Sequence, residues 1–316
     1  MINQLSILQK TIESFSFDIH VPDFTAVMSE TDILNIIQDF DGWIIGDDTV
    51  TEKILQKGKS GRLKVLVKWG VGIDNVDFDL CKKYDISISN TPAMFGEEVS
   101  DIALNYLLTL TRQTHVINEE VRKGNWYKPS GNSLTHKKVA LIGFGDIGRC
   151  VAKKCVAFNM DIYISDPGFY LDKQNNIMSS SGTVIESELN DRVTLSTSLS
   201  ECVNNSDYII VTCSLNKQTY HMIDKEIILL ANKGVILINV ARGAIINEVD
   251  LVELLEQGYI QSAGLDVFTE EPIKVDHPLL KFKQNIYGSH NSSNTIEAVL
   301  KTSKQVLHQM YTSFSI

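Results

Sequence analysis

Three glycines in the stretch KKVALIGFGDIGRCVAKKC have the spacing of a dinucleotide-binding loop. Gly143, Gly145 and Gly148 read as G-x-G-x-x-G, after an apolar strand pattern and before a helical pattern over residues 147–158. In that context the first glycine makes a tight turn, the second lets a pyrophosphate approach the backbone, and the third lets helix and strand pack closely. The stretch therefore predicts a dinucleotide site with the phosphates at the helix N-terminus.

Asp166 closes the next apolar run, DIYISD, eighteen residues after Gly148. At this place in a dinucleotide-binding fold, a carboxylate accepts hydrogen bonds from the ribose hydroxyls of NAD and repels the 2′-phosphate of NADP. We therefore expect the cofactor to be NAD(H).

Four further polar residues follow apolar runs that read as buried strands. Arg242 follows GVILINV, and Asp266 follows SAGL. Glu271 lies in the adjoining VFTEEP, and His290 closes NIYGSH. Each alone has an ordinary explanation as a residue of a turn, a surface loop or the solvent-exposed surface. Because ligands bind where the carboxyl ends of parallel strands meet, Arg242, Asp266 and Glu271 together predict one site beside the dinucleotide, whereas His290 by itself is more readily a structural or surface histidine.

The order of these motifs resembles the D-isomer-specific 2-hydroxyacid dehydrogenase family. Two N-terminal stretches extend the resemblance, KWGVGIDNVDFDLCKKYDISISNTP and KGNWYKPSG, so that it spans about residues 35–305. KWGVGIDN is most similar to the phosphoglycerate dehydrogenase-like members. The resemblance implies two α/β domains with parallel sheets, Rossmann-like or flavodoxin-like, and a cleft between them.

The resemblance implies a catalytic role for Arg242, Glu271 and His290. Arg242 would hold the substrate carboxylate and polarise its 2-oxo group with a planar fork. His290 would exchange a proton with the substrate oxygen. Glu271 would pair with His290, orient the ring and raise its pKa.

The same resemblance implies the residues that bind cofactor and substrate. Asp266 would face the nicotinamide carboxamide, and the Val71 and Gly72 N–H groups would hold the substrate carboxylate. Lys68 would either support that grip or bind a second anionic group of the substrate. The complete cofactor-binding set is Gly143, Gly145, Asp146, Ile147, Gly148, Asp166, Cys213, Val240 and Asp266. We expect no metal site.

The chain departs from the family pattern at several loop positions. Ser289 stands where a proline commonly precedes the histidine, and Ser214 replaces another common proline. Asn291, Ser292 and Ser293 replace the small residues that commonly follow the histidine. The departures concern loop rigidity and pocket polarity, not the reacting groups.

Three functions remain open. The first is a dehydrogenase acting on a small D-2-hydroxy acid: 3-phosphoglycerate, D-lactate, glycerate or the product of hydroxypyruvate or glyoxylate reduction. The second is an NAD-sensing binding protein read by a protein partner, which would bind NADH without turnover. The third is a formate or phosphite dehydrogenase, which Ser289 disfavours because formate enzymes place glutamine there.

Apolar runs alternate with helical patterns along the chain, which favours parallel α/β architecture. We expect a substrate domain over residues 1–100 plus 291–316 and an NAD-binding Rossmann domain over residues 101–290. The candidate strands of the first part are FSFDIHV, DGWIIGD, LKVLVKW and DISISN. The usual first strand of the family is hard to find in MINQLSILQK, and residues 172–190 read as an irregular surface insertion.

Composition bounds the class of protein. The 316 residues are 43% hydrophobic with a net charge of −10, which is ordinary for a globular protein and disfavours nucleic acid and anionic membrane as partners. Five cysteines without a CxxC pair indicate reduced thiols, and we expect a cytoplasmic protein with no membrane partner. The resemblance also implies a homodimer, with the GNW stretch around Trp126 at the contact.

Overall fold

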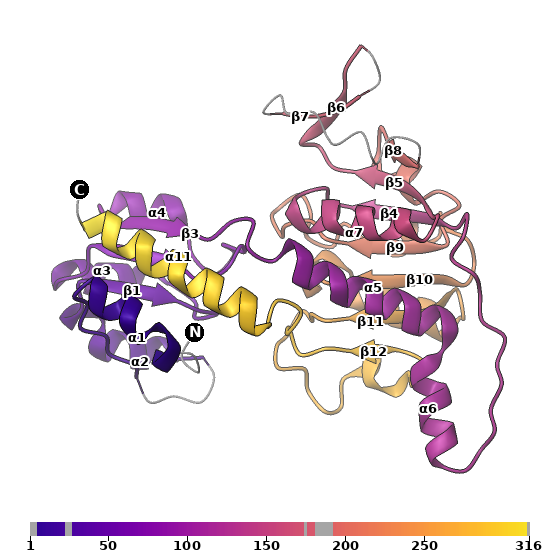
Figure 1. The fold of residues 1–316 in the computed structure, drawn as a ribbon, viewed down its shortest axis with the longest axis horizontal. Helices are drawn as coiled ribbons and strands as arrows, with labels where there is room; N and C mark the ends of the chain where they lie inside the picture. The colour runs from indigo at the N-terminus through magenta and orange to yellow at the C-terminus, as the bar shows by residue number, and fades with distance from the viewer. Residues whose placement is uncertain (1–4, 23–26, 174–175, 181–191, 315–316) are drawn as a thin grey trace. The chain divides into compact units, whose positions relative to one another are not determined.

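The computed structural model describes residues 5–22, 27–173, 176–180 and 192–314. The chain divides into two compact units (Figure 1). The first unit is Met1–Phe95 with Asn294–Ile316, and the second is Gly96–Ser293. No helix in the described ranges is both long and apolar enough to cross a membrane.

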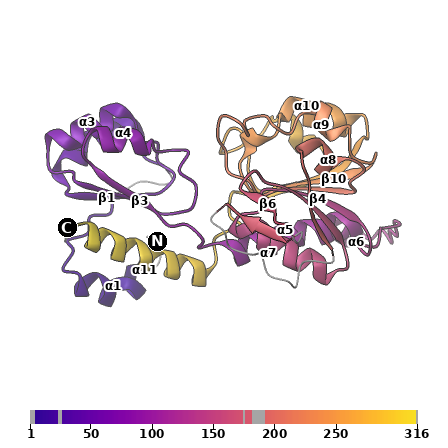
Figure 2. The same ribbon diagram turned by 90° about the horizontal axis from the view of Figure 1, so that it is seen from above.

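The first unit contains a parallel three-stranded sheet in the order β1-β2-β3. Helices α3 and α4 cover one face, and α11 with α1 lies on the other (Figure 2). Every residue of β2 is buried, as expected of a central parallel strand. The bounds are α1 Leu5–Ser14, α2 Glu30–Ile36, η2 Ile37–Asp39, β1 Gly42–Ile45, α3 Glu52–Ser60, β2 Val65–Lys68, α4 Phe78–Lys83, β3 Ser87–Asn90 and α11 Ile296–Phe314.

The second unit is built on a seven-stranded parallel sheet in the order β12-β11-β10-β9-β4-β5-β8. From β4 the strands run outward in both directions, which is the doubly wound arrangement of a dinucleotide-binding fold. Its strands are β4 Lys138–Ile142, β5 Asp161–Ser165, β8 Val193–Leu195, β9 Tyr208–Val211, β10 Val235–Asn239, β11 Ile260–Leu265 and β12 Ile286–Tyr287.

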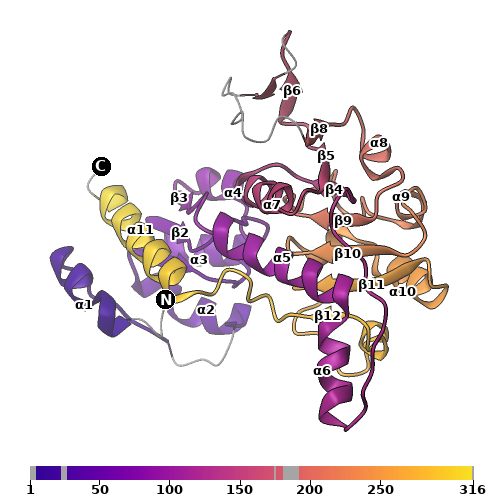
Figure 3. The same cartoon turned by 45° about the vertical axis from the view of Figure 1, so that its right-hand side comes forward.

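Helices cover both faces of this sheet, with α5 and α7 on one side and α8, α9 and α10 on the other (Figure 2). Helix α6 projects away from the sheet (Figure 3). The helices are α5 Gly96–Arg112, α6 Thr114–Arg122, α7 Asp146–Ala157, α8 Leu199–Val203, α9 Lys225–Ile228, η4 Gly243–Ile245, α10 Glu248–Glu256 and η5 Pro278–Lys281.

The insertion expected at residues 172–190 lies in part outside the described residues. Its described part is more regular than expected, because β6 (Phe169–Leu171) and β7 (Ile177–Ser179) form an antiparallel hairpin. Residues 174–175 and 181–191 are not described.

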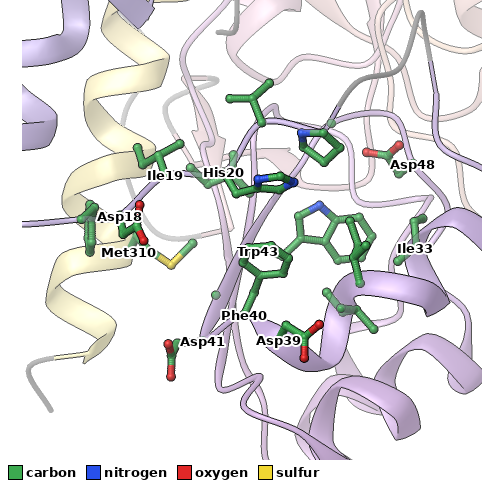
Figure 4. Close-up of a pocket in the computed structure, with 18 of the residues that line it drawn as sticks. Asp18, Ile19, His20, Ile33, Asp39, Phe40, Asp41, Trp43, Asp48 and Met310 are labelled. Atoms are coloured by element: carbon green, nitrogen blue, oxygen red, sulfur yellow. The ribbon is translucent and has the colours of Figure 1, made fainter.

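The expected strand FSFDIHV is wrong, because residues 15–21 form no strand. A cavity of about 950 Å³ separates this segment from β1, the edge strand of the first sheet. Figure 4 shows its wall, with Trp43 between Ile33 of α2 and Met310 of α11, and His20 stacked on Phe40. Among the described residues no backbone hydrogen bond joins residues 17–22 to β1, so the apolar alternation of this segment is not used in a sheet.

Candidate active site

One row of paired residues crosses the sheet of the second unit near the carboxyl ends of its strands. The parallel register places side by side Ser165, Ile142, Val211, Asn239, Leu265 and Tyr287. Each is the last residue of its strand. The segments that follow this row therefore emerge along one edge, and they contain the glycine loop, Asp166, Cys213, Arg242, Asp266 and His290.

The glycine loop after β4 has the geometry that a dinucleotide needs. Gly143 has a φ of +95°, and a Cβ there would lie 2.6 Å from the Cys213 backbone nitrogen. A Cβ on Gly145 would meet no atom within 4 Å, whereas one on Gly148 would lie 2.2 Å from the Gly143 carbonyl. The three glycines thus serve the turn, the open approach and the helix–strand packing in that order.

Helix α7 begins directly behind the loop. Gly145 is its N-cap and provides no side-chain cap, so Asp146 and Ile147 open a helix whose first N–H groups can receive a ligand. Open space at Gly145 together with an uncapped helix N-terminus fits a pyrophosphate.

Cys213 borders the loop from the end of β9, at the point where the strand order reverses. Burial raises the pKa of its thiol to about 12, so the side chain is neutral at physiological pH. Thr212 beside it donates its hydroxyl to the Gly143 carbonyl at 2.9 Å. This crevice is where doubly wound sheets bind nucleotides.

Asp166 lies directly after β5 and holds two backbone N–H groups. Its carboxylate accepts from Phe144 at 2.6 Å and from Gly168 at 2.7 Å. It also lines a cavity of about 450 Å³ whose other walls are Ser165, Pro167, residues 169–171 and residues 195–198. The Asp166 carboxylate thus connects the glycine loop to this cavity.

His290 and Glu271 form an ion-pair contact beyond the ends of β12 and β11. The imidazole Nδ1 lies 2.7 Å from the Glu271 carboxylate, and the side chains are 37% and 33% exposed. The second carboxylate oxygen of Glu271 accepts the Phe268 N–H at 2.8 Å. The pair is therefore accessible to a ligand on one side and fixed to the backbone on the other.

Glu271 has a pKa below the ordinary carboxyl value. Burial would raise this pKa, but hydrogen bonds from His290 and Phe268 and the positive charges of His290 and Arg242 outweigh burial. The environment therefore favours a negatively charged Glu271 next to His290.

Arg242 follows β10 in a loop organised by the last residue of that strand. The Asn239 side chain is buried, donates to the Arg242 carbonyl at 2.9 Å and accepts the Ala241 N–H at 3.0 Å. Arg242 Nη1 donates to the Ala241 carbonyl at 2.8 Å. Val240 is buried between strand and loop, with its N–H donated to the Val211 carbonyl.

Asp266 is only 2% exposed. Its carboxylate accepts hydrogen bonds from the Asn291 and Ser292 N–H groups and the Ser292 hydroxyl. The sequence alone assigned no role to Ser292. The available signal was that serine, which has a hydroxyl group, stands where the family commonly has glycine or alanine. Tyr106 of α5, which also hydrogen-bonds to Asp266, carries no such signal.

The remaining expected residues lie in the first unit. Val71 is 37% exposed, and within the described ranges neither its N–H nor that of Gly72 donates to a backbone carbonyl. Lys68 is 4% exposed, and its ammonium donates to the Gly46 carbonyl at 2.5 Å and lies 3.6 Å from Asp47.

The second unit matches a protein-family model. Residues 104–292, more than half of the chain, match the NAD binding domain of the D-isomer specific 2-hydroxyacid dehydrogenases. The chain belongs to this family. Its members are NAD-dependent oxidoreductases that act on CH–OH groups, and the cofactor and family expected from the sequence are confirmed.

Known proteins show the extent of the likeness. The hydroxypyruvate reductase of Thermotoga maritima is 30% identical, over 92% of this chain and 90% of that protein. The D-3-phosphoglycerate dehydrogenase of Methanocaldococcus jannaschii is 32% identical over 86% of this chain, which spans about half (49%) of that relative. A crystal structure of Aquifex aeolicus D-lactate dehydrogenase, complexed with NAD and lactic acid, has a TM-score of 0.81 and 25% identity, covering 98% and 91% of the two chains.

The lowered pKa of Glu271 predicts a pH-dependent contribution to stability. Because the pKa is lower in the folded chain than the ordinary 4.5, ionised Glu271 stabilises the fold above that value. This contribution is lost as the pH falls through the folded-state pKa. In urea unfolding, Glu271→Gln should therefore be less stable than wild type near neutral pH, with a smaller difference in acid.

The control is Glu270→Gln, which removes an exposed carboxylate paired with Lys274 in the same loop. A deficit for Glu271→Gln that is the same at neutral and acid pH would contradict the assignment.

Proposed function

We propose that the protein reduces small 2-oxo acids to D-2-hydroxy acids with NADH, and catalyses the reverse reaction with NAD. The observation that carries the proposal is the His290–Glu271 contact, with its 2.7 Å separation, on the same sheet edge as the glycine loop. An imidazole paired with a carboxylate is suited to exchange a proton with a substrate oxygen.

Bound NADH supplies the hydride, and the side chains supply orientation and charge. His290 donates a proton to the oxygen that becomes the hydroxyl, while Glu271 fixes the ring and stabilises its protonated form. Arg242 binds the substrate carboxylate and draws electron density from the 2-oxo group. The family resemblance suggests the N–H groups of Val71 and Gly72 as further donors for a substrate carboxylate.

The cofactor would be held by the loop residues already described. Gly143, Gly145 and Gly148 shape the loop, and the N–H groups of Asp146 and Ile147 receive the pyrophosphate. Asp166 receives the adenosine ribose, with the cavity beside it for the base. Cys213 and Val240 supply apolar surface beside the nicotinamide half.

The surroundings of Lys68 favour a small substrate without a phosphate. Its ammonium is buried against the Gly46 carbonyl and the Asp47 carboxylate, so binding a second anion would require exchange of these contacts. We therefore place hydroxypyruvate and glyoxylate ahead of 3-phosphohydroxypyruvate. The likeness to the hydroxypyruvate reductase of Thermotoga maritima, which extends over 90% of that relative, supports the same ranking of substrates.

Loss of NADH absorbance tests the proposal directly. The panel comprises hydroxypyruvate, glyoxylate, pyruvate, 2-oxoglutarate and 3-phosphohydroxypyruvate. We expect turnover with hydroxypyruvate or glyoxylate, and a fall in kcat of about 10²- to 10⁴-fold in His290→Ala, because the proton donor is lost. The Kd for NADH should stay within about twofold, since the proton donor is not a pyrophosphate ligand.

The matched control is His308→Ala, which removes an exposed histidine of α11. NADH binding without turnover of any panel member would instead support an NAD-sensing protein. Equal losses of kcat and NADH affinity in His290→Ala would show that His290 is structural.

Asp166 predicts the preference between cofactors. Because its carboxylate would repel a 2′-phosphate, Asp166→Ala should shift the ratio of kcat/KM for NADH over NADPH toward NADPH by at least about tenfold. Both values should fall, since the variant also loses the acceptor for the Phe144 N–H. Asp161→Ala, at the other end of β5, is the control, and an unchanged ratio in Asp166→Ala would place the ribose elsewhere.

We further propose a homodimer formed through α6 and the segment after it. None of the α6 residues is buried, and Val121, Trp126 and Tyr127 are 46%, 79% and 44% exposed. Apolar side chains gathered in this way favour burial against a partner surface. Sedimentation equilibrium should show a dimer that Trp126→Ala weakens, whereas Tyr170→Ala, an exposed aromatic of the β6–β7 hairpin, leaves it intact. A wild-type monomer would contradict the proposal.

A further inference from the structure

One buried residue, Asp266, holds three consecutive residues after β12 through its backbone carbonyl and its carboxylate. His290 donates its backbone N–H to the Asp266 carbonyl at 2.7 Å. The Asp266 carboxylate accepts the N–H of Asn291 at 3.3 Å and that of Ser292 at 3.0 Å. Ser292 also donates its hydroxyl to the same carboxylate. Asp266 thus accepts four hydrogen bonds from residues 290–292.

Burial makes this arrangement restrictive. Asp266 is 2% exposed and Ser292 is 6% exposed. A carboxylate that is removed from water must be satisfied by protein donors, and hydrogen bonds to a charged acceptor are stronger than those between neutral groups. If the 290–292 turn moved away, the carboxylate would lose donors that water cannot readily replace. The turn is therefore held to the end of β11.

His290 needs such support because of its backbone conformation. Its φ is +54°, in the left-handed region that is unfavourable for a residue with a Cβ. A conformation of this kind persists where the surrounding contacts determine it. The N–H groups of His290 and of the next two residues all end on Asp266. These contacts set the direction in which the imidazole leaves the backbone, toward Glu271.

Helix α5 closes the other side of Asp266. A Cβ on Gly288 would lie 2.1 Å from Asp266 Oδ1 and 2.5 Å from the Tyr106 hydroxyl, so the three groups are in close contact. Burial and then the negative charge of Asp266 raise the pKa of Tyr106, which remains a neutral hydrogen-bond donor. Asp266 therefore has little freedom to turn away from the 290–292 segment.

We propose that Ser292 and Asp266 are positioning residues that fix His290 in the orientation for proton transfer. This inference rests on the proposed function, because it assigns proton transfer to His290. Both Asp266 carboxylate oxygens accept hydrogen bonds from the turn that carries His290, so a change at Ser292 reaches the reaction through His290. The Ser292 hydroxyl is a donor that glycine or alanine at that position would lack.

The expected effect is on chemistry and not on cofactor binding. A displacement of about 1 Å in a reacting group can cost about 100-fold in rate, and removal of one of four hydrogen bonds should cost less. We expect Ser292→Ala to lower kcat for the panel substrate about tenfold, with the Kd for NADH unchanged within about twofold.

A double-mutant cycle with Glu271→Gln separates positioning from a general structural role. Ser292 bonds to Asp266 and Glu271 bonds to His290, so the two substitutions affect different contacts. If both act by orienting His290, the double variant should lose little more kcat than Glu271→Gln alone. Multiplicative losses would overturn the proposal. Ser293→Ala, the same change one residue later, should leave kcat unchanged.

Hydrogen exchange of the full-length protein provides a readout that needs no substrate. In Ser292→Ala, the amides of residues 290–292 should exchange at least about tenfold faster, while those of the β4 core stay unchanged. Unchanged exchange, or faster exchange with unchanged kcat, would overturn the proposal. Suppose that Ser292→Ala exchanges faster at residues 290–292 but the wild-type protein turns over no 2-oxo acid. This result would refute the proposed function and would still support the contacts by which Asp266 holds the turn.

Discussion

Parallel strand pairing is the constraint on which the rest of the second unit depends. The aligned row from Ser165 to Tyr287 ends six strands at one level. Burial of the sheet under helices on both faces requires nearly continuous apolar strands, so polar chemistry is confined to the loops beyond this row. The phosphate loop and the His290–Glu271 contact share an edge for this reason, although nearly 150 residues separate Gly143 from His290.

Loops alone would not hold reacting groups in place, and the chain uses polar residues at strand ends to do so. Asp166 accepts N–H groups from the glycine loop and from its own loop. The Asn239 side chain binds the backbone of Ala241 and Arg242 in the turn after β10. Asp266 does the same for the turn that carries His290. In each case a side chain at or just beyond the paired row satisfies backbone groups that a loop would otherwise leave unpaired.

Much of this arrangement could be predicted from the chain itself. The glycine spacing and the apolar runs on either side of it predict the strand–loop–helix unit, because each glycine answers a separate steric demand. The parallel α/β class follows from alternating patterns and is confirmed. The alternation in FSFDIHV misled, because period-two patterning cannot show whether a neighbouring strand is present to pair with. The contacts of Ser292 and Tyr106 with Asp266 join residues far apart in the chain, and no local pattern reports them.

The most direct test of the proposed hydride transfer is the fate of a deuterium label carried at C4 of the nicotinamide. NADH labelled with deuterium at this carbon, in separate samples for its two faces, is incubated with the protein and hydroxypyruvate, and the product is examined by mass spectrometry and chiral chromatography. If the protein catalyses the proposed reaction, one of the two labelled forms delivers its deuterium to C2 of the D-enantiomer of glycerate. An unlabelled product from both forms, or an L-product, would contradict it.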